Sequence, residues 1–165
     1  MPTSPAQIET ALRELTFAAE WPDGLRHEAA AMADEVCFAA GTIIFRSGQS
    51  HDRVYLIRSG LVALEMGVPA RGQSRLLTLG PGDLLGWSPL LGQLTMTATA
   101  LALEDTEVYS LPGPALLALC QTNHEFGFAV MSGLARSLAR RLTAARLQLL
   151  DLYSPMPPEF RTEGV

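Results

Sequence analysis

Residues 41–64 read GTIIFRSGQSHDRVYLIRSGLVAL, and this stretch decides the fold that the sequence predicts. Its apolar runs, at TIIF, RVYLI and LVAL, are short and rich in β-branched or aliphatic residues, as strands are. Gly48 and Gly60 stand between these runs, where a turn with positive φ costs glycine little. The stretch therefore predicts neighbouring antiparallel strands joined by tight turns.

The same strand pattern continues beyond this stretch. Further short apolar runs occur at RLLTL, MTATALA and TEVYSL, each bounded by turn-forming residues. We therefore expect residues 35–111 to form an antiparallel jelly-roll-like β-barrel. The flanking segments, residues 1–34 and 112–153, place apolar residues three and four apart, which predicts helices, with Pro22 at one helix start. The sequence thus predicts an α+β fold, ending in a Pro-rich flexible tail over residues 154–165.

The long C-terminal helix is predicted to carry an apolar seam. The seam spacings of 3, 4, 4, 3, 4 and 3 resemble a heptad repeat and are formed by Met131, Leu134, Leu138, Leu142, Ala145, Leu149 and Leu152. Leu147 and Leu150 fall outside this seam, so the helix is apolar on more than one face. We expect a homodimer through the seam residues Met131 to Leu149. A helix folded entirely onto its own domain would also be apolar, and this alternative stays open.

Charge and composition argue against a nucleic-acid partner. The chain has 17 acidic residues and 12 basic ones, all of them Arg, for a net charge of −5. This balance disfavours a surface built to neutralise phosphates. The local basic cluster of Arg136, Arg140, Arg141 and Arg146 is predicted to be the solvated face of a helix. The helical pattern ends near Tyr153 and no recognition helix follows it, so we expect no DNA binding by this chain.

Other functional classes lack their sequence signals. No secretory signal and no apolar run long enough for a membrane span is present. Cys37 and Cys120 are the only cysteines and form no CxxC pair, so a cytoplasmic location is expected. His27, His51 and His124 stand in no metal-binding motif, and no catalytic motif occurs. We expect neither a cofactor nor a catalytic activity.

The run from Gly41 to Leu64 resembles the opening of the cyclic-nucleotide-binding domain, the sensor domain of catabolite-activator-type proteins, kinase regulatory subunits and gated channels. Gly41, Gly48, the strand VYLI and Gly60 fall at that family's spacing. Residues 79–86, LGPGDLLG, resemble the entry to the family's phosphate-binding cassette, and residues 98–111 resemble the two strands that follow. The resemblance covers roughly residues 22 to 150 and implies a non-catalytic sensor or regulatory protein without the DNA-binding module.

The resemblance places the cassette at residues 81–99, with two departures from the family pattern. In the family, an Arg neutralises the cyclic phosphate and a Glu accepts from the ribose hydroxyl. Here Met96 stands at the Arg position and Trp87 at the Glu position. Binding of cyclic AMP or cyclic GMP in the usual mode is therefore disfavoured. The ligand-site residues that the resemblance implies are Gly82, Asp83, Leu85, Gly86, Trp87, Ser88, Met96 and Thr97.

Three uses of this pocket stay open. The first is a non-standard small-molecule ligand in a pocket lined by Leu85, Trp87, Leu90 and Met96. The second is a ligand-free module that binds a protein effector, with Trp87 and Met96 as core residues. The third is weak or non-standard cyclic-nucleotide binding, possible if an anion site survives.

Two features bear on such an anion site. Ser88 is predicted to cap a short helix that has Pro89 at its first position, and free amides there could hold an anion. Arg75 could supply a charge from a neighbouring strand, although an alternating strand favours a solvent-facing position for it.

Overall fold

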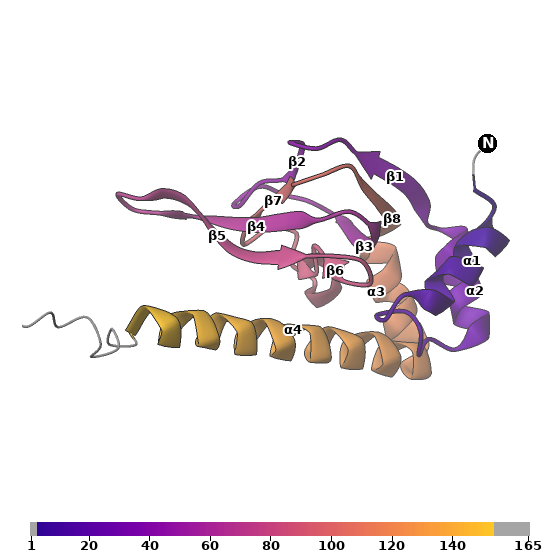
Figure 1. The fold of residues 1–165 in the computed structure, drawn as a ribbon. Coiled ribbons are helices and arrows are strands. Elements are labelled where there is room, and N and C mark those ends of the chain that lie inside the picture. Colours follow the sequence, from indigo (N-terminus) through magenta and orange to yellow (C-terminus); the bar gives the residue numbers. More distant parts are fainter. Residues whose placement is uncertain (1–2, 154–165) are drawn as a thin grey trace, which may run out of the picture.

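The computed structural model describes residues 3–153 and contains helices at both ends of a β region (Figure 1). The helices are α1 (Pro5–Glu14), α2 (Asp23–Ala31), the 3₁₀ helix η1 (Ser88–Leu91), α3 (Gly113–Thr122) and α4 (His124–Tyr153). The strands are β1 (Asp34–Phe38), β2 (Ile43–Phe45), β3 (Arg53–Ser59), β4 (Val62–Val68), β5 (Gly72–Leu79), β6 (Leu84–Leu85), β7 (Thr99–Ala102) and β8 (Thr106–Pro112). The fold is α+β, as the sequence predicts. The tail predicted at residues 154–165 lies outside the described residues.

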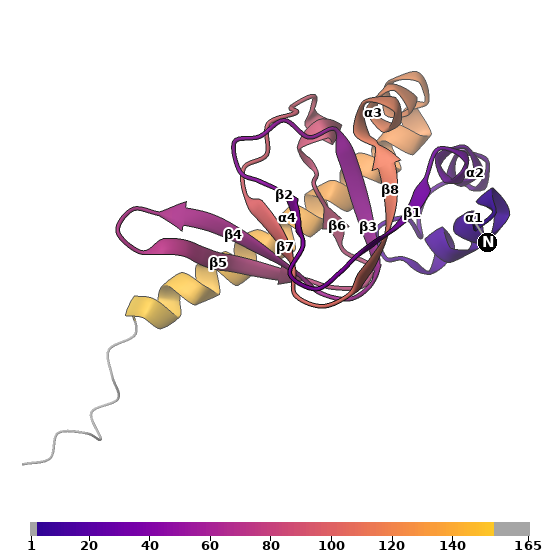
Figure 2. The ribbon, with the colours of Figure 1, turned by 90° about the horizontal axis from the view of Figure 1, so that it is seen from above.

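The strands form two antiparallel sheets of four strands each (Figure 2). One sheet has the order β1-β8-β3-β6, and the other has the order β2-β7-β4-β5. The antiparallel strands predicted for residues 35–111 are present, and within residues 3–153 they pair in two separate sheets with no closed barrel. Among the described strands, every connection except the β4–β5 hairpin passes from one sheet to the other, including those from β3 to β4 and from β7 to β8.

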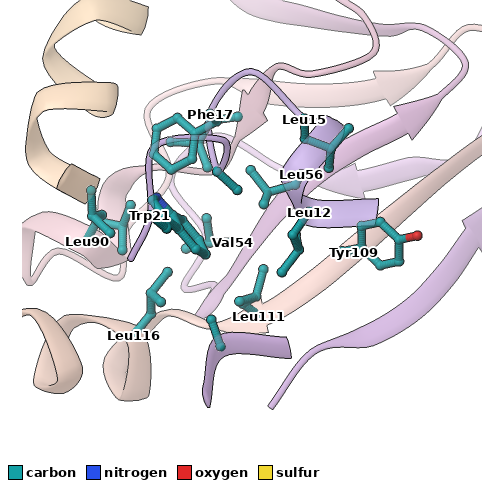
Figure 3. Packing of buried hydrophobic residues seen from close by; sticks show 14 of the residues in the cluster. Leu12, Leu15, Phe17, Trp21, Val54, Leu56, Leu90, Tyr109, Leu111 and Leu116 are labelled. Carbon is teal, nitrogen blue, oxygen red and sulfur yellow. The ribbon is translucent and has the colours of Figure 1, made fainter. Parts of the chain in front are cut away.

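The first core cluster joins the N-terminal helices to the rest of the chain. Trp21 is fully buried and packs edge-on against Phe17 and Phe126, with ring centroids 6.0 and 5.1 Å away. Figure 3 shows Trp21 among Phe17, Val54 and Leu90, which come from three different parts of the chain. This cluster fixes α1 and α2 against β3, η1 and the start of α4.

The second core cluster takes its residues from both sheets, so it lies between them. Its members are Phe45, Tyr55, Ile57, Val62, Leu79, Leu85, Met96, Ala100 and Val108. Met96 is the member that comes from a segment outside the regular strands, just before β7. The segment expected to bind a ligand therefore contributes directly to the core.

Helix α4 is buried near its start and more exposed toward its end. Phe126, Val130 and Leu134 near its start are buried in the first core cluster. Its later turns run beneath the β4–β5 hairpin and beyond the bulk of the sheets (Figures 1 and 2). No helix within residues 3–153 is both long enough and apolar enough to cross a membrane.

Candidate functional site

The site begins at a tight turn between β5 and β6, which a carboxylate within the turn stabilises by a hydrogen bond to the backbone. Gly82 has φ of 87°, a conformation that suits glycine. The Asp83 carboxylate accepts a hydrogen bond from the Gly80 backbone N–H at 2.9 Å, and the Gly82 N–H donates to the Ile57 carbonyl at 2.8 Å. These bonds hold the turn against β3. The Asp83 side chain therefore stabilises the turn that carries it.

The short helix after this turn differs from the sequence prediction. Trp87, and not Ser88, occupies the N-cap position of η1, and no side chain caps the helix. Ser88 and Pro89 are its first two residues, and both are buried. The helix is a single 3₁₀ turn of 4 residues, so few free amides are available for an anion. The predicted anion site at Ser88 has no structural support.

Met96 is a core residue with only 3% of its surface exposed. Its backbone is fixed on both sides, because its N–H donates to the Gln49 carbonyl at 3.0 Å and its carbonyl accepts from the Gly48 N–H at 2.8 Å. The side chain packs in the second core cluster between the sheets. The neighbouring Thr97 is exposed, as expected for adjacent residues of an extended chain.

A small cavity marks the centre of the candidate site. Its volume is about 30 Å³, roughly the share of one liquid water molecule. The lining residues are Phe45, Leu64, Gly86, Trp87, Ser88, Met96, Thr97, Ala98 and Arg141. Trp87 is half-buried here and also packs against the first core cluster. Side chains of this chain thus fill most of the space at the site.

The structure brings together only part of the site set expected from the sequence. Gly86, Trp87, Ser88, Met96 and Thr97 line the small cavity. Leu85 and Leu90 are instead fully buried, Leu85 in the second core cluster and Leu90 in the first. Gly82 lies against Thr16, and Asp83 lines a separate crevice. These four expected lining residues stabilise the fold around the cavity.

Arg141 is the site residue that sequence reasoning missed. It extends from α4, donates a hydrogen bond to the Leu84 carbonyl oxygen and lines the cavity beside Trp87. Burial lowers the pKa of the Arg141 guanidinium, while the nearby Asp83 charge acts in the opposite direction. The prediction of a solvated face is therefore wrong for this residue. Helical spacing could have found it, because Val130, Leu134, Ser137 and Arg141 are separated by 4, 3 and 4 positions.

The other arginines considered from the sequence lie at the surface. Arg75 is exposed on β5 and lines neither the small cavity nor the crevice beside it. Arg140 and Arg146 are exposed on α4, and the Arg136 guanidinium pairs with the Glu20 carboxylate at 2.6 Å. Arg141 is thus distinguished from this basic cluster by its burial.

The predicted dimer seam is only partly exposed. Leu134 has 3% of its surface exposed and packs in the core of its own chain, so it cannot meet a partner. Met131 and Leu138 are half-buried, whereas Ala145, Leu149 and Leu142 are exposed, Leu142 to 53%. Phe128 is 77% exposed and extends the stripe toward the start of α4. The exposed and half-buried apolar residues of α4 form a regular heptad pattern, which we call the exposed α4 stripe. Its members are Phe128, Met131, Ala135, Leu138, Leu142, Ala145 and Leu149.

The two cysteines differ in environment. Cys37 is exposed on β1, whereas Cys120 is buried in α3, where burial raises the pKa of its thiol to about 11. The Cys120 thiol therefore stays protonated near neutral pH and packs as a small apolar group. Within the described part of the chain, no three His, Cys, Asp or Glu side chains gather closely enough to hold a metal ion.

The comparisons with known proteins agree with this architecture. The family model for the cyclic nucleotide-binding domain matches residues 35–123, more than half of the chain. The chain belongs to the cyclic nucleotide-binding domain family. The matched range contains both sheets, the turn at Asp83 and the segment that carries Trp87 and Met96.

Relatives within the family include named regulators. The chain is 40% identical over 118 residues to a cyclic AMP receptor protein of Thermus thermophilus, a match covering 71% of this chain and 52% of that protein. It is 30% identical over 123 residues to the HTH-type transcriptional regulator Cmr of Mycobacterium tuberculosis, covering 74% and 48% of the two chains. The chain thus spans about half the length of these curated relatives.

Solved structures of the family share the fold. The catabolite activator protein of Thermus thermophilus superposes with a TM-score of 0.64 at 32% identity, covering 86% of this chain and 62% of that chain. A cyclic nucleotide-binding domain from Methylobacillus flagellatus gives a TM-score of 0.75 at 16% identity, covering 92% and 85%. The second likeness concerns the fold alone.

Proposed function

We propose that this chain is a non-catalytic regulatory domain of the cyclic nucleotide-binding family that does not bind cyclic AMP or cyclic GMP in the usual mode. The observation that carries the proposal is the small volume of the cavity, about 30 Å³, with Met96 buried beside it. Sites for drug-sized ligands are typically about 300–1,000 Å³. A cyclic nucleotide would need displacement of Trp87, Met96 or Arg141 to enter.

The replacement of the family's Arg by Met96 and of its Glu by Trp87 supports the same proposal. The absence of an Arg facing a partly buried phosphate removes about 2–5 kcal/mol of binding free energy. An unpaired ribose hydroxyl removes about 1–3 kcal/mol more. Asp83 cannot replace the missing Glu, because its carboxylate accepts from the Gly80 N–H within the turn and lines a different crevice. Arg141 does not restore the family's Arg, because it comes from α4 and its guanidinium donates to the Leu84 carbonyl, whereas the family's Arg position is Met96.

The nucleotide part of this proposal is tested by thermal unfolding with and without cyclic AMP or cyclic GMP. We expect the melting temperature to stay unchanged at millimolar nucleotide. A ligand present at 100 times its Kd would stabilise the fold by about 2.7 kcal/mol, which raises the melting temperature by about 5–10 °C for a chain of this size. Such a rise would show that the nucleotide binds and would refute the proposal. The cyclic AMP receptor protein of Thermus thermophilus serves as a positive control.

A homodimer through α4 is the second part of the proposal. The exposed α4 stripe offers apolar side chains at heptad spacing along most of a 30-residue helix. A second copy of the chain would cover the same stripe on its partner in a two-fold arrangement. We propose that a cytoplasmic protein effector, whose identity the sequence does not indicate, reads this dimer.

Replacing Leu142 by Asp is expected to convert the dimer into a monomer, because a carboxylate in an apolar seam is buried without a partner. Light scattering coupled to size-exclusion chromatography measures the mass. Leu147→Asp is the matched control, since Leu147 is 57% exposed but lies about 140° around the helix from Leu142. A dimeric Leu142→Asp variant, or dissociation by both substitutions, would place the interface elsewhere.

A further inference from the structure

A crevice between β5 and α4 has a lining unlike that of the small cavity. Its volume is about 190 Å³, and it is lined by Leu77, Thr78, Leu79, Asp83, Ser137, Arg140, Arg141 and Ala144. This volume holds about six water molecules. The helix runs beneath β5 in this region (Figure 1). Arg141 lines both the crevice and the small cavity, so it lies between them.

The Arg141 charge has no carboxylate partner in the described part of the chain. Its hydrogen bond goes to the Leu84 carbonyl oxygen, a neutral acceptor, and no carboxylate of residues 3–153 forms an ion pair with it. A guanidinium has five N–H donors in a planar fork that matches an oxyanion. A half-buried cation with one neutral hydrogen-bond partner therefore retains the capacity to bind an anion.

The neighbouring charges act on this cation in opposite directions. Arg140 lines the same crevice, and its positive charge adds to the burial that already lowers the pKa of Arg141. The negative charge of Asp83 raises the pKa of Arg141, and the Asp83 carboxylate also accepts a hydrogen bond from the Gly80 N–H. Two adjacent guanidiniums at one crevice repel each other, and an anion placed between them would relieve the repulsion.

We propose that this crevice binds a small oxyanion, a phosphate or a carboxylate group, through Arg141 and Arg140. Thr78 and Ser137 line the crevice and offer hydroxyl donors to the same group. Asp83 opposes an anion by charge, which favours a ligand that also carries a hydroxyl or ammonium donor. This crevice adjoins the cavity at the cassette through Arg141, and the proposal goes beyond the proposed function, which concerns cyclic nucleotides.

Titration with inorganic phosphate and with succinate, at constant ionic strength, tests the proposal. Binding is followed by calorimetry or by backbone amide shifts of β5 and α4 in NMR spectra. We expect saturable binding of at least one of these anions, and their relative affinities distinguish a phosphate site from a carboxylate site. Arg141→Gln should weaken that binding about tenfold or more. Arg75→Gln removes the same charge from an exposed position of β5 and should leave the affinity unchanged within about twofold.

A second variant keeps the test decisive if Arg141→Gln fails to fold. Asp83→Asn removes the opposing charge while its amide oxygen can still accept from the Gly80 N–H, so phosphate should bind several-fold more tightly. Absence of saturable binding of both anions up to about 50 mM would overturn the proposal. Equal weakening by Arg141→Gln and Arg75→Gln would also overturn it, because only net charge would then matter.

Discussion

Replacing Gly60 by alanine is expected to lower the free energy of unfolding by about 2–6 kcal/mol, combining backbone strain with overpacking. Gly60 has φ of 92°, which L side chains rarely adopt. A Cβ there would lie 2.6 Å from the Asp105 carbonyl oxygen and 2.6 Å from the Thr106 Cα. Both are backbone atoms, Asp105 at the end of the β7–β8 connection and Thr106 at the start of β8. The chain could accept the methyl group only by moving that connection.

The contact matters because it joins the two sheets. Gly60 begins the connection from β3 to β4, and Asp105 lies in the connection from β7 to β8. The Leu61 carbonyl accepts from the Leu103 N–H at 2.8 Å, so the two connections are held together by hydrogen bonds. Displacing one of them would weaken the packing of the second core cluster between the sheets.

Urea denaturation of Gly60→Ala and Gly48→Ala separates the clash from the strain. Gly48 also has positive φ, 79°, but an added Cβ would meet nothing within 4 Å. Gly48→Ala should therefore cost only the conformational part, about 1–2 kcal/mol. Equal losses for the two variants would mean that the close approach at Gly60 contributes nothing.

Replacing Met96 by alanine is expected to destabilise the fold by about 2–5 kcal/mol, the range for truncating a buried Met. Met96 packs between the sheets, and its backbone is bonded to Gly48 and Gln49 on both sides. The neighbouring residues can therefore move little to fill the cavity that the truncated side chain leaves. The measurement is again urea denaturation, at a pH where both proteins unfold in two states.

Thr97→Ala is the matched control for Met96→Ala. Thr97 is the next residue, lines the same cavity and is exposed, so its truncation should change stability by less than about 0.5 kcal/mol. A Met96→Ala loss as small as this would show that Met96 is a dispensable wall of a binding surface. That result would favour the alternative of a non-standard ligand over a filled pocket.

The sequence predicted the fold class because its turns are marked locally. Gly48 and Gly60 occupy positive φ, and short apolar runs between such residues specify strands. It did not predict how the strands divide between the two sheets. That division depends on which strands pair, for example β6 with β3 and β5 with β4. Local sequence patterns do not predict which strands pair.

The candidate site was predictable only in part, for similar reasons. The family spacing drew attention to Trp87 and Met96, but it could not show that Met96 is buried between the sheets. Arg141 was missed because it lies far from the cassette in sequence and reaches it through the packing of α4. Leu134 was assigned to the dimer seam although it belongs to the core. Periodicity gives the faces of a helix but not which face meets its own domain.

We propose that side chains of this chain fill the family's nucleotide pocket. Calorimetric titration of the wild-type protein with cyclic AMP and with cyclic GMP tests it most directly. Loss of the two polar contacts should weaken binding by about 10²-fold or more, so we predict no saturable heat of binding at micromolar protein and nucleotide. A Kd below about 10 μM for either nucleotide would mean that the phosphate is held without an Arg at position 96, and would contradict the claim.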